Sequence, residues 1–138
     1  VLAQTIAAEA AAGLVPAWER RLAALLPAAD TRVAADVGAR LKLSNAQRVR
    51  VVAAVQPAGP APHWAMAYKD GGETVVDRLL IAGEAAATAP LIGWQRPKLP
   101  ASGKDIIARG VLPGPEVARR LGAFERAWVK AGFPDDAA

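Results

Sequence analysis

Start and stop signals for helices crowd the C-terminal part of the chain. Ser102 is a typical residue to cap a short helix, and the Asp105 carboxylate three positions on suits the positive end of a helix. Gly110 suits the left-handed conformation just past a helix end. Gly114 and Pro115 then favour the start of a second helix, because proline in the first turn costs no hydrogen bond. The segment therefore predicts two helices joined by a tight Gly-Val-Leu-Pro-Gly-Pro turn.

The second of these helices, expected over 115–131, is amphipathic. On a wheel of about 100° per residue, four apolar side chains fall within about 60° of one another, and three cationic ones fall within about 40° on the opposite side. We expect the apolar stripe to pack and the cationic stripe to face water, where it can bind phosphates by releasing counterions. The apolar residues are Val117, Leu121, Phe124 and Trp128, and the cationic residues are Arg119, Arg126 and Lys130.

The turn before this helix adds a second feature suited to an anion. Backbone N–H groups at a helix N-terminus suit a phosphate, and Gly114 stands at that position. Lys98, Lys104 and Arg109 bring further positive charge to the same third of the chain, although the whole chain is only +4. The alternative interpretation, which is the usual one for an isolated charge run, is a solvated helix face with no ligand.

Helical signals also dominate the rest of the chain, and no stretch alternates at period two for long enough to be a strand. Leu2, Ile6 and Ala10 predict one inward face of a first helix, which Gly13 and Pro16 end. A second helix is expected to turn Leu22, Leu25 and Leu26 inward. Asp30 predicts the cap of a third helix, and Ser44 with Gln47 predicts a capping box for a fourth that runs to Val55. After a glycine pair, the next helix turns four residues inward, namely Val75, Val76, Leu79 and Leu80.

These signals predict an all-α fold: a compact multi-helix domain of about 8–9 short helices that ends in a helical hairpin and a basic amphipathic helix. With 138 residues and 14.3 kDa, the chain is long enough for one domain with its own core. Front helices at 1–55 and a tail half at 63–138 flank a Pro/Gly loop at 56–62, and we do not expect the halves to be independent domains.

Composition narrows the class of protein. The chain contains no cysteine, which excludes disulfides and thiolate chemistry and fits the cytoplasm. The N-terminal segment carries Gln4 and Glu9 and no basic region, unlike a signal peptide. The longest apolar stretch, 79–94, is interrupted by Glu84 and Pro90, so we expect no membrane span.

The segment from Leu99 to Phe133 resembles the tail of bacterial CCA-adding tRNA nucleotidyltransferases of the poly(A) polymerase type. The stretch from Arg40 to Ala46 and the stretch from Tyr68 to Leu80 look like the body of the same family. Ala101 stands where a leucine is usual, and Ala118 where a glycine is usual. The matching tail positions are Pro100, Gly103, Asp105, Ile106, Ile107, Gly110, Val111, Pro113, Gly114, Pro115, Val117, Leu121, Glu125 and Trp128.

The resemblance implies that this chain is the body and tail of a larger enzyme and grips tRNA. Nucleotidyl transfer would belong to an N-terminal head that holds Mg²⁺ and takes CTP and ATP. Such heads carry an Asp-x-Asp pair, and no such pair occurs in this sequence. We therefore expect no catalytic residue, metal or cofactor in this chain. Whether the parent enzyme adds CCA, only A, or poly(A) depends on that head.

Two other functions remain open. The Gly-Val-Leu-Pro-Gly-Pro turn also resembles helix-hairpin-helix elements, which predicts a free-standing nucleic-acid-binding module. The third alternative is a helical protein-interaction domain whose basic face only keeps it in solution. The predicted RNA contacts under the favoured hypothesis are Lys98, Lys104, Arg109, Gly114, Arg119, Arg126 and Lys130.

Isolated residues elsewhere favour structural roles. His63, the only histidine, has no cysteine or carboxylate at ligand spacing and is expected on the surface. Trp64 and Trp94 have apolar neighbours and are expected to anchor the core rather than stack on bases. Arg48 lies at the edge of an apolar helix face and is the expected paired core arginine, whereas Arg50 is expected to point outward.

Overall fold

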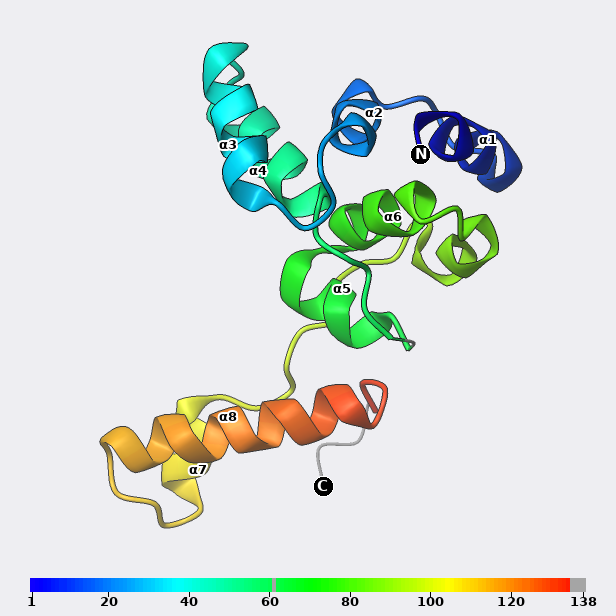
Figure 1. The fold of residues 1–138 in the computed structure, drawn as a ribbon. Coiled ribbons are helices and arrows are strands. Elements are labelled where there is room, and N and C mark those ends of the chain that lie inside the picture. Colours follow the sequence, from blue (N-terminus) through cyan, green and yellow to red (C-terminus); the bar gives the residue numbers. More distant parts are fainter. Residues whose placement is uncertain (61, 135–138) are drawn as a thin grey trace. The chain divides into compact units, whose positions relative to one another are not determined.

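A computed structural model describes residues 1–60 and 62–134. These residues form eight α-helices and one 3-10 helix and contain no strand, which confirms the all-α class. The chain divides into two compact units, Val1–Gln95 and Arg96–Ala138. The first unit holds α1 (Leu2–Ala12), α2 (Trp18–Leu25), α3 (Thr31–Arg40), α4 (Asn45–Ala54), α5 (Trp64–Asp70), α6 (Gly72–Ile81) and the 3-10 helix η1 (Ala85–Leu91), and the second holds α7 (Gly103–Ala108) and α8 (Pro115–Lys130) (Figure 1).

The division between the units falls after Gln95. The Pro/Gly-rich segment 56–62, which is the clearest break in the sequence, connects α4 to α5 and belongs to the first unit. The helices before and after this segment share contacts, since α6 packs against both α2 and α4.

Several helix ends in the first unit have the predicted local chemistry. Gly13 ends α1 in the left-handed region with φ of 69°. The Asp30 side chain accepts a hydrogen bond from the backbone N–H of Val33 at 3.0 Å, at the start of α3. Ser44 and Gln47 form the expected capping box of α4, with bonds of 3.2 and 2.9 Å between side chain and backbone in each direction.

Helix α6 is the centre of the first unit, since it contacts α1, α2, α4, α5 and η1. The four inward residues predicted for it are all buried. They belong to one apolar cluster with Ala8, Ala67 and Leu91, from α1, α5 and η1. A second cluster joins α2, α3 and α4 through Ala23, Ala34 and Val51.

The inward faces of α1 and α2 differ from the prediction. In α1 the buried residues are Thr5, Ala8 and Glu9, whereas Ile6 is 40% exposed. Of the three leucines predicted to face inward near α2, Leu22 and Leu26 pack against the second apolar cluster and Leu25 is exposed, while Arg20 is buried. The apolar pattern does not identify the inward faces of these helices, because the charged residues Glu9 and Arg20 are buried there as an ion pair.

The buried charges form one network between four helices. Arg20 from α2 reaches Glu9 of α1 and Asp77 of α6, each at 2.8 Å. Arg50 from α4 approaches the second oxygen of Asp77 at 2.9 Å. The prediction that Arg48 is paired and Arg50 points outward is therefore wrong, because Arg50 is the arginine of α4 that pairs with Asp77. Arg48 lies beside Gly38 of α3, and a Cβ added to Gly38 would come within 2.9 Å of Cγ of Arg48.

Candidate nucleic-acid interface

The second unit forms the predicted helical hairpin. At the start of α7, Oδ2 of Asp105 accepts hydrogen bonds from the Ser102 backbone N–H at 2.7 Å and from its hydroxyl at 3.1 Å. Gly110 follows α7 with φ of 95°. Gly114 precedes α8 with φ of 140°, and Pro115 occupies the first turn. The stop and start signals of the sequence are thus confirmed at both helices.

Helix α8 turns its apolar stripe inward, as predicted. Val117, Leu121 and Phe124 are half-buried, and Trp128 is 6% exposed. Helix α7 lies against α8 (Figure 1). The approach is close, because a Cβ placed on Gly103 would meet Cγ1 of Val117 at 3.4 Å.

The C-terminal end of α8 is covered by the residues that follow it. Trp128 donates a hydrogen bond from Nε1 to the carbonyl oxygen of Pro134 at 2.9 Å. Its ring meets the ring of Phe133 edge-on, with centroids 5.1 Å apart. These contacts bury Trp128 and fix the inner face of α8, so the opposite face is left toward solvent.

The three cations of the predicted stripe, Arg119, Arg126 and Lys130, are all exposed on that opposite face. Arg119 is ion-paired with Glu116 one turn before it. Arg120, a fourth exposed cation that the sequence analysis did not single out, donates from Nε to the same carboxylate at 2.8 Å. At one end of the stripe, the charge of Arg119 is therefore partly neutralised by Glu116. At the other end, Arg126 and Lys130 form no ion pair with the described residues.

Glu116 changes the electrostatics at the N-terminus of α8. Hydrogen bonds from Arg120 and Arg119 lower the pKa of its carboxyl and outweigh the opposing effect of desolvation. The carboxylate lies in the first turn, where the helix dipole also favours a negative charge. A phosphate near Gly114 would be repelled by the Glu116 carboxylate, which already occupies the first turn of α8. Phosphate binding at Gly114 therefore stays a prediction.

The other predicted contacts are exposed cations of the same unit. Lys98 lies before α7, Lys104 lies in its first turn, and Arg109 directly follows its end. Charge is uneven between the two units. Residues 96–138 carry eight lysines and arginines against five carboxylates, a net +3, whereas residues 1–95 carry nine against eight, a net +1.

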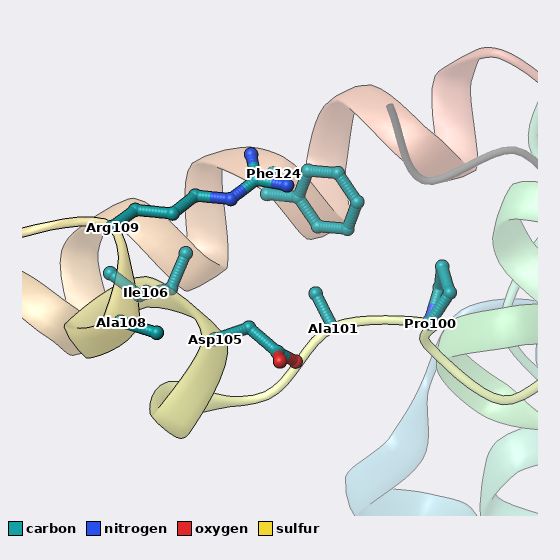
Figure 2. A pocket seen from close by; sticks show the side chains of 7 residues that line it. All are labelled: Pro100, Ala101, Asp105, Ile106, Ala108, Arg109 and Phe124. Carbon is teal, nitrogen blue, oxygen red and sulfur yellow. The ribbon is translucent and has the colours of Figure 1, made fainter.

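A groove of about 340 Å³ opens between α7 and α8, and the sequence analysis did not predict it. Figure 2 shows Phe124 on the α8 side and Ile106 on the α7 side, with the guanidinium of Arg109 extended toward Phe124. Ala101 contributes only a methyl group, which helps to leave the space open. The seven lining residues are Pro100, Ala101, Asp105, Ile106, Ala108, Arg109 and Phe124.

One of the missed features could have been found in the sequence. Glu116 stands three and four residues before Arg119 and Arg120, which is the spacing of ion pairs along a helix. The groove has no such signal, because its walls come from α7, from α8 and from the segment before α7.

The two tryptophans and the histidine singled out in the first unit differ in burial. Trp94 packs against the first apolar cluster, as expected for a core anchor, but Trp64 is 40% exposed. His63 is half-buried rather than on the surface, and its Nδ1 is buried without a hydrogen-bond partner in the part of the chain that the structure describes.

Among residues 1–60 and 62–134, no cluster of three or more His, Cys, Asp or Glu side chains is arranged to hold a metal ion. Over the same residues, no helix combines the length and the apolar character that crossing a bilayer requires.

Comparisons of the chain with protein-family models, with curated proteins and with solved structures found no match. The arrangement of the second unit is therefore the main support for a function.

Proposed function

We propose that this chain binds folded tRNA through its C-terminal unit, as the body and tail of a nucleotidyltransferase that adds CCA or poly(A). The observation that carries the proposal is the alignment of Arg119, Arg126 and Lys130 along the solvent face of α8. A row of exposed cations on a rigid helix suits the phosphate backbone of an RNA helix, which proteins recognise largely by shape and phosphate contacts.

The charge distribution supports the same surface. The second unit has a net charge of +3 in 43 residues, and the larger first unit has only +1. Long-range attraction of a polyanion would therefore act mainly on the unit that carries the stripe. The resemblance of the segment from Leu99 to Phe133 to the tail of CCA-adding enzymes favours tRNA among the possible polyanions.

In this proposal the chain supplies position rather than chemistry. The helices of the first unit would set the distance between the tRNA elbow and a catalytic head. The head would hold Mg²⁺ and the nucleotide. The residues of this chain would hold the acceptor and TΨC arms while the 3′ end reacts elsewhere.

A competition experiment tests the proposal against its alternatives. Labelled tRNA is bound to the chain at low salt and displaced by unlabelled tRNA, duplex DNA or an unstructured single strand. We expect tRNA to compete best. Equal competition by duplex DNA would favour a helix-hairpin-helix module. No salt-dependent binding to any of the three would favour a helical protein-interaction domain.

A further inference from the structure

The groove between α7 and α8 lies beside the cationic stripe but has a different chemical character. Its floor and walls are largely apolar, from Pro100, Ala101, Ile106, Ala108 and Phe124. None of these five side chains can pair with a phosphate. The groove therefore suits a flat apolar group better than the RNA backbone.

The size of the groove limits what can occupy it. Sites for small ligands span roughly 300–1,000 Å³, and the volume of about 340 Å³ lies at the lower end of that range. It has room for one nucleobase and too little for a partner helix. The half-buried ring of Phe124 lines it, and a phenyl ring is a platform on which a base can stack.

Two charged groups at the groove match the two ends of a nucleotide. Arg109 is exposed and extends its guanidinium along the groove, where it can pair with a phosphate (Figure 2). Asp105 uses only Oδ2 to bind Ser102. Its Oδ1 accepts no hydrogen bond from the described residues and can accept one from an exocyclic amino group, as acidic side chains do from cytosine N4.

We propose that this groove binds one unpaired nucleobase that carries an exocyclic amino group, with the adjoining phosphate at Arg109. The occupant is an RNA base rather than an apolar protein side chain, because the unit that contains the groove carries most of the net positive charge of the chain. The inference rests on the proposed RNA-binding function and adds a base preference to it. Adenine, cytosine and guanine can stack on Phe124 and donate this hydrogen bond from their amino group, whereas uracil can stack but has no amino group to donate it.

The test uses two RNA octamers of the same charge, rC8 and rU8, with the full chain at neutral pH. We expect rC8 to bind about fivefold more tightly than rU8, which is the low end of base discrimination by a hydrogen-bonding side chain. Ala101→Leu fills the groove without changing charge and should abolish this difference. Ala118→Leu makes the same change at an exposed position of α8 outside the groove lining and should preserve it.

A second variant addresses the stacking platform. Phe124→Leu keeps an apolar side chain in the interface of α7 and α8 but removes the aromatic face, so it should weaken both octamers by about fivefold. The helical circular dichroism of each variant is recorded beside its binding curve. A Phe124→Leu chain that retains its helicity and binds both octamers as tightly as the parent would overturn the proposal.

The outcomes separate this inference from the proposed function. If rC8 and rU8 bind equally and Ala101→Leu changes nothing, while tRNA still binds in a salt-dependent way, the groove holds no base and the tRNA proposal stands. If neither the octamers nor tRNA bind at low salt, the RNA-binding function itself is wrong, and the groove proposal is overturned with it.

Discussion

Arg20 donates a hydrogen bond from Nε to Oδ1 of Asp77 at 2.8 Å, and both side chains are almost completely buried. Arg50 donates to both oxygens of the same carboxylate, to Oδ2 at 2.9 Å and to Oδ1 at 3.2 Å, and Glu9 accepts from Nη1 of Arg20. The four residues come from four different helices of the first unit. Removing one partner of such a network leaves a buried charge without full compensation, which costs far more than losing an exposed ion pair.

Asp77→Asn should therefore lower the free energy of unfolding by about 3 kcal/mol, because it leaves the two arginines without their shared carboxylate. Urea unfolding followed by circular dichroism measures the change. Asp36→Asn, the same substitution at an exposed position of α3, is the control and should alter stability by less than about 0.5 kcal/mol. Equal effects of the two substitutions would show that the buried network contributes little.

The free energy of unfolding should depend on pH through the ionisation of Glu9. Burial alone would raise the pKa of its carboxyl, but hydrogen bonds from Arg21 and Arg20 outweigh burial and lower it. The unfolded chain therefore binds this proton more tightly than the folded chain. The stabilisation is fully present above the ordinary glutamate pKa of about 4.3 and is lost as the pH falls through the lower folded value.

Unfolding of the parent and of Glu9→Gln between pH 7 and pH 3 tests this sign. The stability advantage of the parent should shrink as the pH falls below about 4.3. Glu84→Gln, at an exposed position, should show no comparable change. An advantage that is constant over the whole range would contradict a lowered pKa for Glu9.

The local signals in the sequence predict helix ends well, because the groups that cap a helix lie within a few residues of one another. Ser44 with Gln47, Ser102 with Asp105, and Gly114 with Pro115 are examples in which the partners are at most three positions apart. No tertiary information is needed to recognise them. The amphipathic pattern of α8 was equally readable, because its apolar and cationic residues differ sharply in character.

The inward faces of α1 and α2 could not be predicted in the same way. Alanine dominates α1, so the apolar contrast between its faces is weak. The residues that decide its burial are charged, and their partners are remote: Arg20 is 11 positions from Glu9 and 57 from Asp77. Only the fold brings these groups together. The periodicity of α4 likewise favours Arg48 as the paired arginine, because the partner of Arg50, Asp77, is 27 positions away in the sequence.

Glu116→Gln should strengthen RNA binding. The substitution removes a negative charge beside the stripe and releases Arg119 and Arg120 from their ion pairs. Because exposed ion pairs contribute little in water, we expect tRNA affinity to rise only by about two- to threefold at low salt. Glu125→Gln, which changes the net charge of the same helix equally, should have a smaller effect, since no ion pair of Glu125 exists among the described residues. Weaker binding by Glu116→Gln would mean that Glu116 orients the arginines for RNA.

The chain alone should not extend tRNA. Two-metal phosphoryl transfer requires carboxylates that hold two ions about 3.5–4 Å apart, and the sequence lacks an Asp-x-Asp pair. Incubation with tRNA lacking CCA, with CTP, ATP and magnesium, should leave the RNA length unchanged on a sequencing gel. Labelled product from a chromatographically pure sample would refute the assignment of the chemistry to a separate head.

The salt dependence of tRNA binding tests the central claim most directly. If about three cations of the second unit meet phosphates, log K should fall against log salt with a slope of roughly −2 to −3. Replacing Arg119, Arg126 and Lys130 together by glutamine should flatten this slope while the melting temperature stays nearly unchanged. Replacing Arg32, Arg40 and Lys42, which are exposed cations of the first unit, makes the same charge change and should leave the slope intact. Tight tRNA binding by the first triple variant, with the slope of the parent, would contradict the account and leave the stripe as a solvated face.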